Sequence, residues 1–166
     1  MNILFVCTHN RCRSILAEAI FSSHAGNLAL NVKSAGSQPA GKVHPESLLA
    51  LSRNNIPCEY LQSQSWEDFS QWPCDLIITV CDSAAQESCP HYFSSAQVLH
   101  WPLKDPSSIE GSESQRIEAF DKLVSQLQSA ANEFCNRIKA SGPKSAIDCL
   151  IEYGAKHKET SNSVAL

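Results

Sequence analysis

Four short apolar runs divide the first hundred residues, and each is followed by a loop or by a helical pattern. The runs cover residues 2–6, 28–36, 75–80 and 96–101. The third run is continuously apolar and β-branched, which is typical of a strand buried on both faces. Because strands alternate with helices, the pattern predicts an α/β fold with a parallel sheet and right-handed crossovers.

Helical spacing of apolar residues predicts three helices between and after these strands. The first ends near Gly26 and places Glu18 on its outer side. The second begins at Pro45, a residue that suits the first turn of a helix. The third follows a capping box at residues 112–115 and continues to residue 138. This last helix is long enough to cover one face of the sheet.

We expect one domain over residues 1–139 and a C-terminal tail of unknown function over residues 140–166. The boundary falls in the segment Lys-Ala-Ser-Gly-Pro-Lys, residues 139–144, which contains helix-breaking residues. Apolar residues in the tail favour a short helix over residues 146–158. Residues 159–166 are predicted to fray.

Composition narrows the possible partners. The chain has 166 residues, a formal net charge of −4 and no block of Lys or Arg, which argues against nucleic acid. The N-terminal apolar run is too short for a signal peptide, and no run approaches the length of a membrane span, so we expect a cytoplasmic protein without membrane contact. In that compartment disulfides are transient, so a few of the eight cysteines are expected to be reactive.

The segment Cys-Thr-His-Asn-Arg-Cys-Arg-Ser, residues 7–14, joins the first strand to the first helix. Unpaired N–H groups at a helix N-terminus suit an oxyanion. The helix dipole and Arg13 both favour a thiolate on Cys7, and Ser14 can donate its hydroxyl to the same sulfur. The alternative is a buried structural cysteine, but the loop has no large apolar residue to pack against it. The residues expected to surround the anion are Thr8, His9, Asn10, Arg11, Cys12 and Arg13.

This pattern, a cysteine and five residues before Arg-Ser, with Asn10 and Cys12 between them, resembles the low-molecular-weight tyrosine phosphatase family. The resemblance implies a three-layer sandwich around a four-stranded parallel sheet. Two groups of enzymes share that fold, namely the phosphatases and the thioredoxin-linked arsenate reductases. His9 stands where glycine is usual. Ile15 replaces the proline that commonly follows Arg-Ser in the phosphatases, and this favours the reductases.

Cys81 and Cys89 form a second informative pair, and Cys89 is followed by proline. From the residues alone they could be unrelated thiols or, with His91, zinc ligands, although their spacing is poor for zinc. The resemblance implies a redox cascade for arsenic detoxification. Cys7 would form an adduct with arsenate, Cys81 would attack Cys7 and release arsenite, and Cys89 would carry the disulfide outward to thioredoxin. A helix between the two would hold their Cα atoms about 12 Å apart, so we expect the segment to unwind on oxidation.

Asp105 precedes Pro106 and resembles the general acid of the same family, although Asp-Pro is also a common turn. Since Cys7, Cys81 and Asp105 each follow a strand, they should meet at one edge of the sheet. Aromatic residues usually come next in the phosphatases. Here the sequence is Ser-Ser-Ile-Glu-Gly, which suits a small inorganic anion such as arsenate, with phosphate or sulfate as mimics. The alternatives are a protein tyrosine phosphatase and a non-enzymatic anion sensor.

The resemblance also raises the question of a potassium ion, which some of these reductases bind. Asn10, Glu18 and Ser34 match residues of that site, but the aspartate expected near residues 64–65 is missing. We therefore expect no metal ion and no other cofactor.

Overall fold

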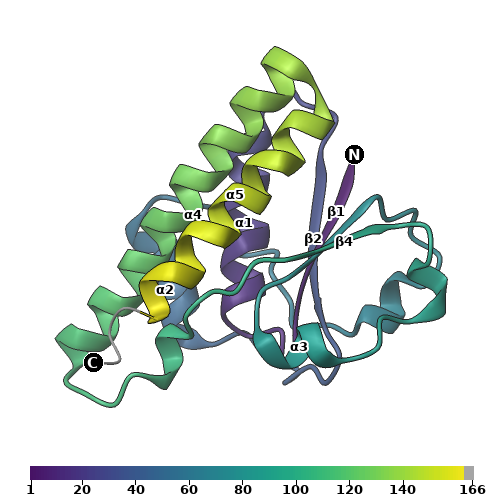
Figure 1. Cartoon of the computed structure of the whole chain (residues 1–166). Coiled ribbons are helices and arrows are strands. Elements are labelled where there is room, and N and C mark those ends of the chain that lie inside the picture. The colour runs from purple at the N-terminus through teal and green to yellow at the C-terminus, as the bar shows by residue number, and fades with distance from the viewer. Residues whose placement is uncertain (163–166) are drawn as a thin grey trace.

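The computed structural model describes the backbone of residues 1–162 and the side chains of residues 1–155. Four strands form one parallel sheet in the order β2-β1-β3-β4. The strands are β1 (Asn2–Cys7), β2 (Asn31–Gly36), β3 (Leu76–Thr79) and β4 (Gln97–His100). Their parallel direction and the helices between them confirm the α/β fold expected from the sequence (Figure 1).

The strand register places the ends of the strands beside one another. Val6 of β1 pairs with Ala35 of β2 and with Thr79 of β3, and Thr79 pairs in turn with His100 of β4. All four residues of β3 are buried, as its continuous apolar run predicts. The loops that leave the strands therefore start from one common edge, where ligands bind in open parallel sheets.

One face of the sheet is covered by long helices, which are α1 (Arg13–Ala25), α4 (Glu113–Ser141) and α5 (Pro143–Asn162). Phe21 of α1 packs against Phe5 of β1 and Phe134 of α4, with ring centroids 5.0 and 5.6 Å apart. A further helix, α2 (Pro45–Arg53), packs against α4. In the described part of the chain, no helix combines the length and apolar character that a membrane span requires.

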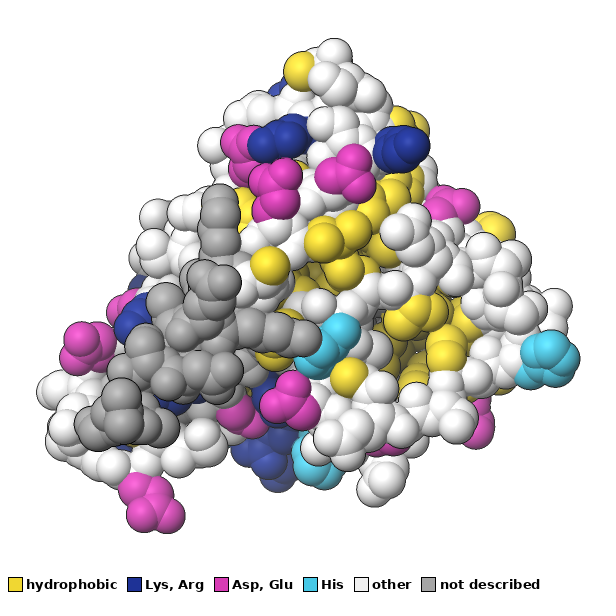
Figure 2. All heavy atoms as spheres, viewed as in Figure 1, with side chains coloured by type: hydrophobic (Ala, Val, Ile, Leu, Met, Phe, Trp, Pro, Cys, Tyr) yellow, Lys and Arg dark blue, Asp and Glu magenta, His cyan; other side chains and the backbone are white. Residues whose placement is uncertain are grey.

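The opposite face carries shorter elements, which complete the three-layer sandwich. They are α3 (Asp82–Gln86) and two 3₁₀ turns, Trp66–Phe69 and His91–Phe93. The first turn begins with a capping box between Ser65 and Asp68. These elements cover the sheet only in part, and Figure 2 shows hydrophobic side chains around a hollow on this side of the molecule.

The expected outward position of Glu18 is wrong. Only 2% of this residue is exposed, because its side of α1 lies against β2. Ser34 Oγ of β2 donates a hydrogen bond to Glu18 Oε2 at 2.6 Å. This contact compensates for the burial of a carboxylate among apolar residues.

The C-terminal segment is more helical than the sequence suggests. The break between α4 and α5 is a single residue, Gly142, which has a φ of 84°. The second helix starts at Pro143 and buries Ala146 and Leu150 completely. Part of the segment expected to fray, residues 163–166, lies outside the described residues.

Candidate active site

The loop after β1 brings hydrogen-bonding groups to the Cys7 sulfur. Ser14 Oγ lies 3.0 Å from Cys7 Sγ, and the backbone N–H of Asn10 donates to the same sulfur at 3.2 Å. Only 4% of Cys7 is exposed. A cysteine that ends a strand and faces a helix N-terminus in this way can act as a nucleophile toward a bound anion.

Asn10 holds the conformation of this loop. Its φ is 43°, in the left-handed region that few residues other than glycine and asparagine adopt. The buried side-chain amide donates to Ser14 Oγ and Ser34 Oγ, both at 2.9 Å, and accepts from the Gln64 backbone N–H at 2.8 Å. The hydrogen bonds offset the backbone strain and fix the backbone that surrounds Cys7.

Arg13 and Asp105 form an ion pair across this edge of the sheet. Arg13 Nη2 lies 2.9 Å from Asp105 Oδ2, and Nη1 donates to the Leu103 carbonyl oxygen at 3.3 Å. The other carboxylate oxygen accepts from Ser107, at 2.9 Å from its N–H and 2.6 Å from its hydroxyl. The predicted acid is therefore held beside the predicted anion-binding arginine.

These groups line a cavity of about 230 Å³. Its lining residues are Cys7, His9, Arg11, Cys12, Arg13, Asp105 and Ser107. A thiol, a guanidinium and a carboxyl group thus meet in one concave site. This is the arrangement required to bind a tetrahedral oxyanion, attack it and protonate a leaving oxygen.

Cys81 lies at the border of the loop of residues 7–14, which we call the anion loop. Its sulfur accepts from the Ala84 N–H at 3.4 Å, which places it at the N-terminus of α3, and lies 3.7 Å from Thr8 Oγ1. Thr8 directly follows Cys7. The structure therefore places the Cys81 thiol beside Thr8, the residue that follows the predicted nucleophile Cys7.

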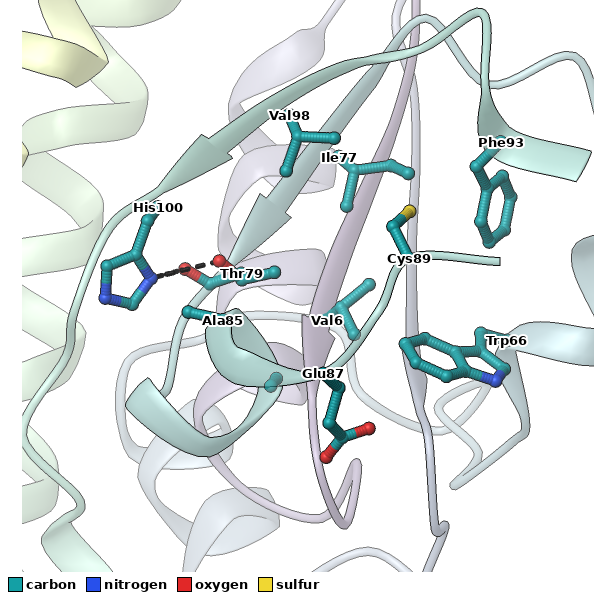
Figure 3. A pocket seen from close by; sticks show the side chains of 11 residues that line it. Val6, Trp66, Ile77, Thr79, Ala85, Glu87, Cys89, Phe93, Val98 and His100 are labelled. Atoms are coloured by element: carbon teal, nitrogen blue, oxygen red, sulfur yellow. Dashed lines mark hydrogen bonds between the residues drawn. The ribbon is translucent and has the colours of Figure 1, made fainter. Parts of the chain in front are cut away.

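Cys89 occupies a different place. Its side chain lines an apolar cavity of about 190 Å³ on the sheet, together with Trp66, Phe93 and Val98 (Figure 3). The residue as a whole is exposed, and partial burial of its thiol against this cavity raises the pKa of Cys89. The helix after Cys81 ends at Gln86, so it does not continue to Cys89.

A sequence model described as "Low molecular weight phosphotyrosine protein phosphatase" matches residues 2–144. The chain belongs to this family. Relatives named arsenate reductase include one from Staphylococcus xylosus, 35% identical over 122 residues, which are 74% of this chain and 91% of that protein. Another, from Bacillus licheniformis, is 30% identical over 132 residues, which are 80% of this chain and 93% of that protein.

Two solved structures that are similar to this chain are named for different activities. A thioredoxin-dependent arsenate reductase from Corynebacterium glutamicum has a TM-score of 0.57 and 30% identity, over 78% of this chain and 61% of that one. The arginine phosphatase YwlE, as a mutant with a phosphorylated active-site serine, has a TM-score of 0.66 and 27% identity, over 85% of this chain and 97% of that one.

The residues that match a potassium site, Asn10, Glu18 and Ser34, are joined to one another by hydrogen bonds. Glu18 Oε2 and Ser34 Oγ accept hydrogen bonds from Ser34 and Asn10, and the Gln64 amide donates to the Ser34 carbonyl oxygen at 3.2 Å. Burial also raises the pKa of Glu18. Among the described residues, no three His, Cys, Asp or Glu side chains form a cluster that could hold a metal.

Cys12 lies within the phosphatase-family loop, but its environment differs from that of Cys7. Burial raises the pKa of the Cys12 thiol to about 12. A thiol that stays protonated is a poor nucleophile, so the surroundings of Cys12 favour a packing role.

Two residues with a part in this site were missed in the sequence. Ser107 binds Asp105 with both its N–H and its hydroxyl, and an Asp-Pro-Ser turn is a local signal that could have revealed it. Gln64 contacts Asn10 through its backbone N–H. No sequence signal marks that contact, because it depends on how the chain after β2 folds back.

Proposed function

We propose that this chain is a cytoplasmic, thioredoxin-coupled arsenate reductase. The observation that carries the proposal is the position of Cys81, whose sulfur lies 3.7 Å from Thr8 Oγ1 at the border of the anion loop. A phosphatase of this family needs only the nucleophile, the arginine and the acid. A reductase needs a second thiol near the first, since arsenate reduction takes two electrons.

The first step is formation of a bond between Cys7 and arsenic. The Cys7 thiolate attacks arsenate, a bond from arsenic to oxygen breaks, and Asp105 donates the proton with which that oxygen leaves as water. Arg13 now binds Asp105 Oδ2, so an incoming oxyanion would exchange with this carboxylate oxygen. Ser107, bound to Oδ1, would keep the carboxyl group at the cavity during the exchange.

The second step transfers electrons to arsenic. The Cys81 thiolate attacks Cys7 Sγ, a disulfide forms, and the electron pair of the sulfur–arsenic bond remains on arsenic, which leaves as arsenite. Cys89 then attacks Cys81 and releases the Cys7 thiolate. The dithiol of thioredoxin reduces the Cys81–Cys89 disulfide and is itself oxidised to a disulfide. The two electrons that reduce one arsenate to arsenite therefore come from thioredoxin.

The variant Cys89→Ser tests this scheme. Arsenate-dependent NADPH oxidation through thioredoxin and its reductase is expected to fall by about 100-fold, because the disulfide stays at Cys7 and Cys81. Hydrolysis of an aryl phosphate should stay within about twofold of the wild-type rate. Cys58→Ser is the matched control, since this half-buried thiol lines neither cavity.

Three outcomes would contradict the proposal. Full thioredoxin-coupled turnover of the Cys89→Ser variant would exclude the three-cysteine route. Aryl phosphate hydrolysis without any arsenate reduction by the wild type would identify a low-molecular-weight protein tyrosine phosphatase. Turnover of neither substrate would favour an anion sensor.

A further inference from the structure

Two basic side chains line the anion cavity beside Arg13, namely His9 and Arg11. Their backbone is held in place from outside the loop. The His9 carbonyl oxygen accepts from the Ala40 N–H at 2.9 Å, and the Arg11 carbonyl oxygen accepts from the His44 N–H at 2.9 Å. The backbone from which these two exposed side chains extend is therefore held in place at the cavity.

The charge of Arg11 has no counter-charge in the site. Within the described part of the chain, its guanidinium has neither an ion pair nor a hydrogen bond. Asp105 is the single carboxylate among the described lining residues, and Arg13 and Ser107 already bind it. The positive charge of Arg11 also helps to lower the pKa of His44, after the larger effect of burial.

Uncompensated positive charge at a cavity repels further cations and attracts anions. Figure 2 shows basic, acidic and histidine side chains close together at the lower edge of the molecule, the edge at which the strands end. When an oxyanion takes the place of Asp105 on Arg13, the charge of Arg11 is still unpaired, which favours a ligand with more negative charge than Arg13 alone would bind.

The cavity also has room for more than one small anion. Its volume is about 230 Å³. A cavity of about 150 Å³ is large enough for a benzene molecule with its six heavy atoms. A tetrahedral oxyanion has five, so a second charged group fits beside it.

We propose that Arg11 forms a second cationic subsite, which selects ligands that carry an additional negative charge next to the reacting oxyanion. The inference deepens the proposed function. It rests on that function in one respect, which is that the Cys7 cavity binds a tetrahedral oxyanion. Multiply charged inorganic oxyanions, and esters with an adjacent acidic group, are the favoured class. A cationic group at the same place is disfavoured, so a phosphorylated arginine is a poor ligand for this site.

Inorganic pyrophosphate, which carries a second charged group next to the first, provides the first test, by titration calorimetry of the full chain. Arg11→Gln should raise the dissociation constant about tenfold and flatten its dependence on salt concentration, because one close positive charge is lost. Lys122→Gln removes the same charge from an exposed position on α4 and should match the wild type. Equal affinity and equal salt dependence in all three proteins would overturn the proposal.

A pair of aryl phosphonates, one with a carboxylate and one with a quaternary ammonium group, tests the charge selectivity directly. The wild type should bind the carboxylate compound about tenfold more tightly, whereas Arg11→Gln should bind both about equally. An unchanged preference in Arg11→Gln would refute the subsite. Because these ligands are not turned over, the result is independent of arsenate reduction, and a failure of the reductase proposal would be recognised separately.

Discussion

The residues that support the anion loop form a buried polar chain from α1 to the loop. Glu18 accepts from Ser34 at 2.6 Å, and Ser34 accepts from Asn10 at 2.9 Å. Less than 3% of the surface of Glu18, Ser34 and Asn10 is exposed. In such buried surroundings, loss of any one of these hydrogen bonds would leave a polar group without a partner. The conformation of the anion loop is therefore coupled to the charge state of Glu18 through Ser34 and Asn10.

This coupling predicts a pH dependence of stability. Because burial raises the pKa of Glu18 in the folded state, its contribution to stability is complete below the pKa of an unfolded glutamate, about 4.3. That contribution is lost as the pH rises through the folded pKa. Glu18→Gln does not titrate, so its free energy of unfolding relative to wild type should increase with pH across this window.

Urea unfolding between pH 4 and pH 8 measures the difference. Glu118→Gln, at an exposed position of α4, serves as the control for the loss of one carboxylate. Parallel stability profiles for the wild type and Glu18→Gln would show that burial of Glu18 does not oppose its ionisation.

The end of β2 determines how closely the anion loop can approach the sheet. Gly36 pairs with Cys7 in the strand register. A Cβ atom on Gly36 would lie 2.6 Å from the Thr8 carbonyl oxygen, a distance that real Cβ atoms essentially never show, and 3.0 Å from Asn10 Cβ, which is tighter than most real contacts. Glycine is required here because two backbone segments touch.

Gly36→Ala should therefore displace the anion loop. We expect a loss of about 3 kcal/mol in the free energy of unfolding and at least about tenfold weaker phosphate binding. Gly26→Ala is the control, because its φ is 54° and no atom lies within 4 Å of its added Cβ. It should cost about 1 to 2 kcal/mol through backbone strain and leave phosphate binding unchanged. Equal effects of the two substitutions on binding would contradict this role of Gly36.

The elements differ in how far the sequence predicts them. The spacing of apolar residues predicts the four strands and the helix over residues 113–138. A strand buries every second side chain and a helix every third or fourth, and both spacings can be recognised among neighbouring residues. The prediction that Glu18 lies on the outer side of α1 is wrong. The carboxylate can be buried there because Ser34 of β2 donates a hydrogen bond to it. The position of Cys89 in an apolar cavity depends on tertiary packing, and its sequence neighbours do not reveal it.

Across the whole molecule, α4 and α5 lie side by side as a helical hairpin on one face of the sheet (Figure 1). Leu150 of α5 is fully buried, whereas 45% of its neighbour Ile151 is exposed. Tyr153 of the same helix packs against Trp101, with ring centroids 6.3 Å apart. The second helix therefore adds to the core rather than to the anion cavity at the edge.

Leu150→Ala should lower the free energy of unfolding by about 2 to 5 kcal/mol, because it leaves a cavity in a packed interface. Ile151→Ala should cost less than about 1 kcal/mol. Phosphate affinity at a temperature where both variants are folded should match that of the wild type. Weaker binding by Leu150→Ala alone would show that α5 influences the anion site.

The central position of β1 also affects how the protein is made. Cys7 is synthesised before β3, with which its strand pairs, and before Asp105, which follows β4. Contacts between distant parts of a sequence form late in folding. During synthesis the sulfur therefore passes through a period without its burial or its neighbours, when an oxidant in the cell can reach it. Oxidants present during synthesis can therefore modify Cys7 of an incomplete chain, which would lower the yield of active protein.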